Sequence, residues 1–179
     1  MSELLRLLAE DRAEDRSAVA GTPGYAEFRA RDAARRAAVD AILVRSNAWT
    51  TEEWYAAAWV FNHGDTVDEA RRAHEFAQRA AAQGHKPARW LAAATLDRSL
   101  MYAGKPQHYG TQIVPDGVGW RVWDVEPATT DAGRAEWDVP PLAEMQRRAA
   151  TTTLAQPQGP FESAPQWWRD AMVRWGAAG

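Results

Sequence analysis

A stretch rich in polar side chains, ATLDRSLMYAGKPQHYGTQ, occupies residues 94–112. Its polar members are Asp97, Arg98, Gln107, His108, Tyr109, Thr111 and Gln112. Glutamine amides both donate and accept hydrogen bonds, which suits recognition of a neutral polar group, and Gly110 allows close backbone approach. The same side chains could instead satisfy buried backbone groups where a helix gives way to a strand. On the first interpretation, the substrate-binding candidates are Arg98, Gln107, Tyr109, Thr111 and Gln112.

Acid–base chemistry has three candidate residues, which are His63, His74 and Asp97. Imidazole titrates near neutral pH and can act as a general acid or base. His74 could equally be a hydrogen-bonded structural histidine. His63 precedes Gly64 at an expected helix end, where an imidazolium would interact favourably with the helix dipole. Asp97 could fix a histidine tautomer or hold the backbone of the loop that follows it.

Metal binding is the weaker alternative for these three residues. His63, His74 and Asp97 would make a set of two imidazoles and one carboxylate, but no His-x-x-x-His spacing is present. His85 and His108 do not belong to an obvious pattern. The chain has no cysteine, which excludes thiolate nucleophiles and cysteine-ligated metal centres. No glycine-rich phosphate loop or serine elbow is present, and we predict neither a metal nor a cofactor.

Composition indicates a soluble globular protein of 179 residues, with 46% hydrophobic and 25% charged residues. A net charge of -3 and a pI near 5.8 argue against nucleic acid as a partner. The first residues are acidic and amphipathic, unlike a signal peptide, and no apolar run is long enough to span a membrane. We therefore expect a cytoplasmic protein, and the many Ala and Arg residues are typical of a GC-rich bacterial source.

Helix boundaries are marked by two capping-box patterns, Thr50 with Glu53 and Thr66 with Glu69. Trp49 can staple onto Trp54 at the first of them. Together with glycine stops, these signals predict helices from about residue 4, over 25–44, 50–62, 66–83, 87–102, 131–137 and 142–149, and from about residue 165. Segment 73–94 has the small residues of a tetratricopeptide or Sel1-type helix pair.

A change of periodicity follows Gly104. YGTQIV (109–114) and VGWRVWDV (118–125) flank an Asp-Gly turn and predict a β-hairpin. We therefore expect a mainly α fold: residues 1–150 form a compact antiparallel helical bundle with tetratricopeptide-like packing and one hairpin at about 109–125. Residues 151–164 are a linker by composition.

The last helix, at 165–176 with Ser163 as its candidate cap, carries Trp168, Met172 and Trp175 on one face. Such a face docks on its own domain, or it forms a homodimer or partner contact.

The region from about residue 31 to 148 resembles a bacterial family of uncharacterised proteins, the domain of unknown function 6624. The resemblance rests on AAWVFNHGDTVDEARRAHEFAQRAAAQG (57–84), ARWLAAATLDRSLMYAGKPQHYGTQ (88–112) and VPPLAEMQRR (139–148). It implies no established activity. It marks as part of the family pattern His63, His74, Asp97, Arg98, Gln107, Gly110, Thr111 and Gln112, with an aromatic residue at Tyr109.

Two functions are compatible with these patterns. The first is a small-molecule-binding protein or an enzyme of bacterial metabolism, secondary metabolism included, that uses a pocket lined by His, Asp, Arg and Gln for acid–base chemistry. The alternative is a non-catalytic helical module for protein–protein interaction, with the tail face as its contact surface. The sequence does not decide between an enzyme and a binding protein.

Overall fold

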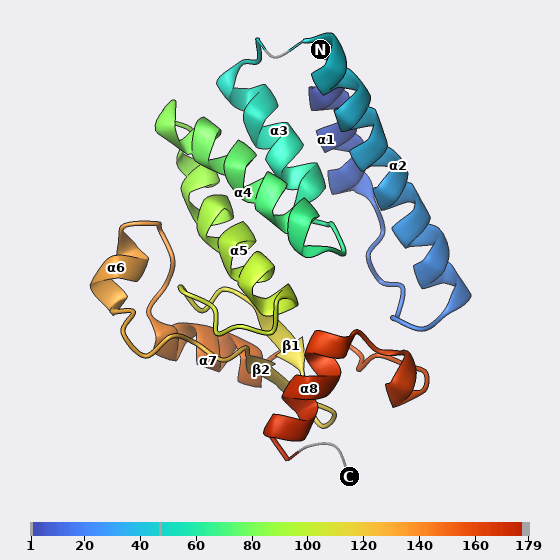
Figure 1. The fold of residues 1–179 in the computed structure, drawn as a ribbon, viewed down its shortest axis with the longest axis vertical. Helices are drawn as coiled ribbons and strands as arrows, with labels where there is room; N and C mark the ends of the chain where they lie inside the picture. The colour runs from blue at the N-terminus through green and yellow to red at the C-terminus, as the bar shows by residue number, and fades with distance from the viewer. Residues whose placement is uncertain (1, 47, 177–179) are drawn as a thin grey trace.

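The computed structural model describes residues 2–46 and 48–176, and helices dominate it (Figure 1). In that part of the chain the α-helices are α1 (Glu3–Ala13), α2 (Pro23–Arg45), α3 (Thr51–Phe61), α4 (Val67–Ala82), α5 (Lys86–Tyr102), α6 (Asp131–Ala135), α7 (Leu142–Ala150) and α8 (Gln166–Arg174). Two antiparallel strands, β1 (Ile113–Pro115) and β2 (Trp120–Val122), form the one small sheet. The predicted mainly helical bundle with a hairpin is confirmed. None of the described helices is both long enough and apolar enough to traverse a bilayer.

Both predicted capping boxes are present. The hydroxyl of Thr50 accepts from the backbone N–H of Glu53, whose carboxylate accepts from the N–H of Thr50 in return. Thr66 and Glu69 repeat the arrangement at the start of α4. The Trp49 and Trp54 ring centroids lie 4.5 Å apart, so the predicted staple also forms.

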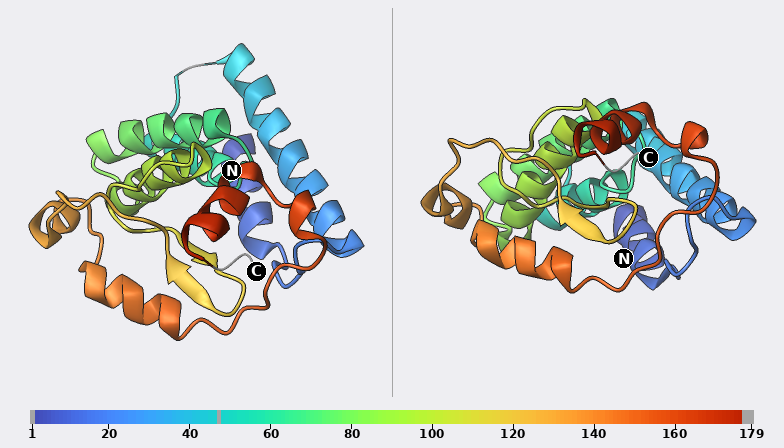
Figure 2. Two further views of the ribbon diagram at one scale, coloured as in Figure 1. Left: turned by 60° about the horizontal axis from the view of Figure 1, so that its bottom comes forward. Right: turned by 90° about the horizontal axis from the view of Figure 1, so that it is seen from below.

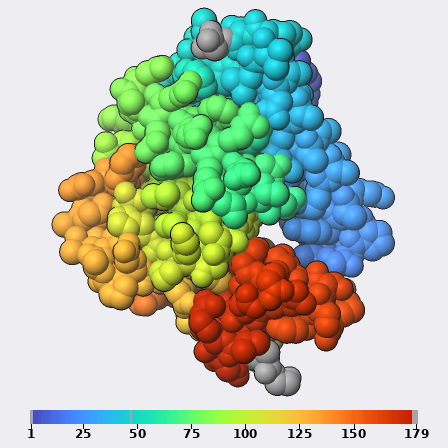
Figure 3. Space-filling view, viewed as in Figure 1, coloured from blue at the N-terminus to red at the C-terminus, as the bar shows by residue number. Residues whose placement is uncertain are grey.

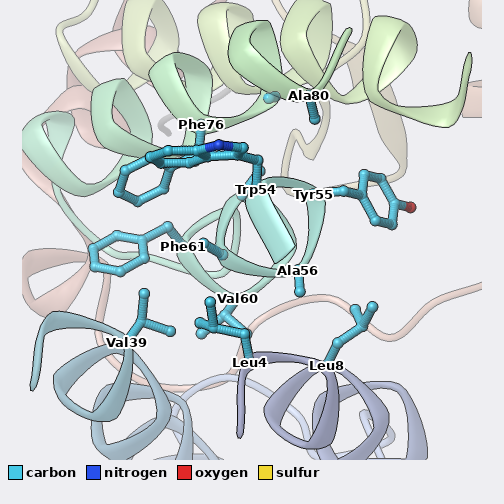
Figure 4. Close-up of a cluster of buried hydrophobic side chains, with 14 of the residues drawn as sticks. Leu4, Leu8, Val39, Trp54, Tyr55, Ala56, Val60, Phe61, Phe76 and Ala80 are labelled. Carbon is cyan, nitrogen blue, oxygen red and sulfur yellow. The ribbon is translucent and has the colours of Figure 1, made fainter. Parts of the chain in front are cut away.

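The larger hydrophobic core lies among α1 to α5. Figure 4 shows Phe61 and Phe76 facing each other across its centre, with Val39 and Leu4 from the first two helices below them. The helices α4 and α5 pack against each other, and both contribute alanines without exposed surface to the core, which are Ala73, Ala77, Ala80, Ala88 and Ala92. Side chains this small let two helix backbones approach closely. The likeness of this pair to a tetratricopeptide unit stays a prediction.

A second, smaller core forms around Trp123, which is 1% exposed. The indoles of Trp167 and Trp175, both from the C-terminal segment, approach it edge-on with centroids 5.5 and 5.3 Å away. Figure 2 shows α8 beside the hairpin, with α7 running along β2. The hairpin and α8 therefore bury each other's apolar surface.

The tail face predicted from the sequence docks on its own chain. Met172 is 4% exposed. The indole N–H of Trp168 donates to the carbonyl of Pro115 at 2.8 Å, and that of Trp175 donates to Asp124 at 2.9 Å. Of the alternatives left open by the sequence, the structure places this face on its own hairpin.

Two local predictions need correction. The first strand begins at Ile113 and not near residue 109, because the backbone of 108–111 is bound by Asp97 and cannot join the ladder.

Ser163 does not cap α8: it lies in a 3-10 turn (Phe161–Ser163), and the residue that precedes α8 is Pro165, whose side chain makes no capping bond.

The linker between α7 and α8 returns to the start of the chain. The backbone N–H of Gln158 donates to the carbonyl of Ala20 at 2.7 Å. Gly21 has φ +92°, and a Cβ on it would stand 1.9 Å from the Gln158 carbonyl oxygen, so only glycine fits there. In Figure 3 the part of the C-terminal segment drawn in red lies at the lower end of the molecule.

Replacing the indole at the centre of the second core should be costly. We expect Trp123→Ala to lower the free energy of unfolding by about 3–5 kcal/mol, because it leaves a cavity among aromatic rings. Urea denaturation monitored by circular dichroism measures this loss. Trp90→Ala is the matched control, since Trp90 is 37% exposed and its removal should cost under about 1 kcal/mol. Equal losses in the two variants would contradict this role of Trp123.

Candidate functional site

Asp97 binds the loop that follows its own helix. One carboxylate oxygen accepts from the backbone N–H groups of His108 and Tyr109, at 2.7 and 2.8 Å. The other accepts from the backbone N–H and the hydroxyl of Thr111, at 2.9 and 2.8 Å. Burial raises the pKa of Asp97, while these hydrogen bonds act to lower it. All four hydrogen bonds to Asp97 come from N–H or O–H donors, and an ionised carboxylate can accept all of them.

The two glutamines also bind backbone groups. The amide of Gln107, which has no exposed surface, donates to the carbonyl of Trp123 at 2.8 Å and accepts from the N–H of Gln112 at 2.8 Å. The amide of Gln112 donates to the carbonyl of Ala94 at 2.9 Å. The polar atoms of Asp97, Gln107, Thr111 and Gln112 are thus used to fasten the loop to α5 and the hairpin.

Tyr109 lies at the edge of this network. Its carbonyl accepts from the guanidinium of the buried Arg134 at 2.9 Å, and its half-buried ring packs edge-on against His108. Burial raises the pKa of the phenol. Gly110, with φ +84°, is a position where a Cβ would come within 3.1 Å of Leu142.

His74 lies between α4 and α5. Its Nδ1 is 2.8 Å from the carbonyl oxygen of Ala92, which fixes the tautomer with a proton on Nδ1. Burial lowers the pKa of His74, so the imidazole is neutral at pH 7. A half-buried, hydrogen-bonded histidine of this kind matches the structural alternative.

His63 has a carboxylate partner that the sequence did not suggest. Its Nδ1 lies 3.2 Å from Oδ1 of Asp11, a residue of α1 that is 1% exposed. The other Asp11 oxygen accepts from the indole N–H of Trp59 at 2.8 Å and pairs with Arg16 at 2.9 Å. Nη2 of Arg16 also lies 3.2 Å from Nδ1 of His63, and it donates to the backbone carbonyl of Asp11 at 3.3 Å. The Asp11 bond therefore places the proton on Nδ1 and leaves Nε2 as the basic nitrogen.

Burial is the main cause that keeps this imidazole neutral. Burial lowers the pKa of His63, the bond to Asp11 opposes this effect, and the positive charges of Arg16 and Arg98 lower it further. Burial alone would raise the pKa of Asp11, but the bond to His63 and the nearby cations bring it below its ordinary value. A neutral imidazole does not fit the charge–dipole role considered for His63 from the sequence.

The turn that carries His63 is clamped from α2 and α5. Arg29 and Arg36 both donate to the carbonyl of His63, and the hydroxyl of Tyr102 donates to that of Gly64 at 3.1 Å. A Cβ on Gly64 would stand 2.4 Å from the Cβ of Glu69, so the turn needs glycine. These contacts fix the backbone of the turn relative to α2 and α5.

Asp11, Asp32 and His63 offer ligand atoms within 4.8 Å of one another, which is close enough to hold a metal ion. Their environment does not fit one, because arginines already occupy the carboxylates. Asp32 pairs with Arg29 and Arg35, and Asp11 pairs with Arg16 and lies 3.4 Å from Arg35. A dication would have to displace these cations, so the cluster is built as a buried ion-pair network.

Arg98 is the exception among the arginines around His63. It is half-buried on α5, and its Nε is buried without a hydrogen-bond partner. The part of the chain that the structure describes contains no hydrogen bond or ion pair to its guanidinium. A cation beside a neutral imidazole, without a carboxylate of its own, can attract an anion.

The structure therefore divides the sequence candidates. The charge of Arg98 acts on His63 and lowers its pKa, whereas Asp97 and the 107–112 residues form a separate internal network, and His74 bonds to Ala92. Sequence reasoning missed Asp11, Arg16 and Trp59. The signal available was a carboxylate at the apolar spacing of α1, where Leu4, Leu7 and Leu8 are buried with Asp11.

Comparison with known proteins found no match to a protein family, a curated protein or a solved structure. The resemblance to the family of domain of unknown function 6624 stays a prediction. The candidate site consequently rests on the geometry of Asp11, His63 and Arg98.

Neutralising Asp97 should loosen the loop. Asp97→Asn replaces one acceptor oxygen with an amide N–H that faces other donors, and we expect a loss of about 3 kcal/mol in the free energy of unfolding. Chemical denaturation measures it. Asp68→Asn, at an exposed position of α4, should change stability by less than about 0.5 kcal/mol. A stable Asp97→Asn protein would argue against this anchoring role.

The acid titration of His63 gives a second test. Because its folded-state pKa lies below the ordinary 6.5, the unfolded chain binds the proton first as the pH falls. The contribution of His63 to stability is therefore complete above about pH 6.5 and is lost progressively below it. Histidine NMR signals should give a midpoint below 6.5 for His63. Asp11→Asn, if its spectrum remains folded, should move the midpoint lower still; a midpoint above 6.5 in the unaltered protein would contradict the assignment.

Proposed function

We propose that this protein binds a small anionic molecule beside His63 and exchanges a proton with it. The observation that supports this most is the hydrogen-bonded Asp11–His63 pair, and the charge of Arg98, which has no hydrogen-bond partner at its buried Nε, lowers the pKa of His63. In this proposal His63 is the general base, Asp11 is the positioning residue, and Arg98 binds a carboxylate or phosphate of the ligand.

The protonation state supports a base. With the proton held on Nδ1 by Asp11, Nε2 has a free lone pair, and no partner for Nε2 is present within residues 2–46 and 48–176. His63 keeps 16% of its side chain exposed, so the ring is reachable from solvent. When Nε2 takes a proton, the carboxylate of Asp11 stabilises the imidazolium that forms, as in other carboxylate–histidine pairs.

The charge balance supports an anionic ligand. The neighbouring cations Arg16, Arg29, Arg35 and Arg36 all pair with carboxylates of the chain. Arg98 has no such partner in the described residues, so a ligand carboxylate or phosphate would complete its pairing. Binding there would also stabilise negative charge that develops as the substrate loses a proton.

The alternative function, a protein-interaction module, has less support. Its expected contact face, with Trp168, Met172 and Trp175, is packed against the hairpin of the same chain. A homodimer or partner through this face stays a prediction without an observation in its favour.

Thermal-shift screening against small carboxylates and phosphates tests the proposal. A compound at a hundredfold excess over its Kd should stabilise the folded protein by about 2.7 kcal/mol. We expect Arg98→Gln to weaken its binding at least tenfold, and His63→Gln to abolish any proton exchange while leaving the fold intact.

Arg71→Gln and His108→Gln are the matched controls, because both residues are exposed and lie on other parts of the surface. They should bind the compound as the unaltered protein does. The proposal fails if no anionic compound binds, if Arg98→Gln binds the hits as well as the controls do, or if His63→Gln still exchanges a proton with the ligand.

A further inference from the structure

A surface cavity of about 330 Å³ lies where α1, α3 and the start of α5 meet. Its lining residues are Leu5, Leu8, Arg12, Glu52, Tyr55, His85 and Pro87. It is distinct from the His63 site: Glu52 and Tyr55 belong to the first half of α3, whereas His63 follows the end of that helix. The volume is within the range of pockets that hold small ligands.

The inner wall of the cavity is apolar and well packed. Leu8 is 8% exposed and Tyr55 is 6% exposed. Figure 4 shows both at one margin of the main core, with the Tyr55 hydroxyl pointing away from it. The ring of His85 stacks on that of Tyr55, with centroids 4.2 Å apart and an interplanar angle of 23°. These contacts hold the wall in one conformation.

One charged group of the rim is held in place without a counterion. The guanidinium of Arg12 donates to the Tyr55 hydroxyl at 3.2 Å and lies 5.2 Å above the ring of Trp59. No carboxylate of the described chain pairs with it, in contrast to Arg16 one turn further along. Glu52 is exposed on the rim, and its charge raises the pKa of His85 against the lowering that burial causes.

We infer that this cavity binds a small molecule with an apolar body and a single carboxylate, which pairs with Arg12. The apolar body would lie against Leu5, Leu8 and Pro87, and the carboxylate would take the unused donors of the guanidinium. The Arg12 side chain is already oriented by Tyr55, so it loses little conformational entropy when a ligand binds. A mobile surface arginine would lose more, which favours Arg12 as the binding residue. Glu52 disfavours a second negative charge on the ligand.

Three probes share a phenylpropyl group and differ in the charge of their end group: 3-phenylpropanoate, 3-phenylpropanol and 3-phenylpropylamine. Comparing their affinities separates the contribution of charge from that of apolar contact. Titration of each into the full-length protein, followed by NMR chemical shifts or calorimetry, gives three dissociation constants. We expect the carboxylate to bind at least tenfold more tightly than the alcohol, and the amine to bind most weakly.

Variants then locate the site. Arg12→Gln should reduce the affinity for the carboxylate to that for the alcohol, and Tyr55→Phe should weaken it by a smaller factor because Arg12 loses its anchor. Leu5→Trp, which fills the cavity from a partly exposed position, should block all three probes. Arg6→Gln, on the outer face of the same helix, is the matched control and should leave binding unchanged.

Equal binding of the three probes, tightest binding of the amine, or carboxylate binding that survives Arg12→Gln would each overturn the inference. Arg98→Gln and His63→Gln should not alter the affinity for 3-phenylpropanoate. If they do abolish it, the probe occupies the His63 site and the cavity is not the binding site. The effect of Arg12→Gln on the affinity for 3-phenylpropanoate tests the cavity whether or not the proposed function at His63 holds.

Discussion

A carboxylate that is removed from water must be surrounded by donors, and this constraint organises both halves of the structure. At Asp97 the donors are backbone N–H groups and a hydroxyl, so one side chain determines the path of the chain from α5 to the hairpin. At Asp11 and Asp32 the donors are arginines, an indole and an imidazole, so the two acids determine how α1, α2 and the turn after α3 meet. The same physical requirement yields a loop anchor in one place and an ion-pair network in the other.

The difference between these solutions bears on function. Backbone donors leave Asp97 with no group that a ligand could use. The network around Asp11 includes a titratable side chain, His63, whose Nε2 has no partner in the described residues, and the guanidinium of Arg98, outside the network, also makes no hydrogen bond there. A buried network of fixed groups is a preorganised environment, in which charge on a ligand meets little reorganisation.

Local signals in the sequence were sufficient for the helices. Thr50 with Glu53 and Thr66 with Glu69 specify helix starts through contacts within a single turn, so no tertiary information was needed. The hairpin turn at Asp116-Gly117 is likewise encoded by neighbouring residues. The length of the first strand depends instead on a distant residue, since Asp97 binds the backbone that would have continued the strand.

The site could be predicted only in part. His63 and Arg98 were recognisable as reactive residue types. The pairing of His63 with Asp11 joins the turn after α3 to α1, which are far apart in the chain, and no local spacing encodes it. The 107–112 side chains looked like a binding loop because a buried structural amide and a ligand-binding amide have the same composition. Only the direction of their hydrogen bonds distinguishes the two roles.

The position of Trp123 has a consequence for how the chain matures during synthesis. Its indole directly follows β2, but the rings of Trp167 and Trp175 that cover it are synthesised more than 40 residues later. The aromatic surface of Trp123 is therefore uncovered until α8 has been synthesised and has docked on the hairpin. Exposed apolar surface on an incompletely folded chain favours aggregation, so the docking of α8 removes a surface of this kind.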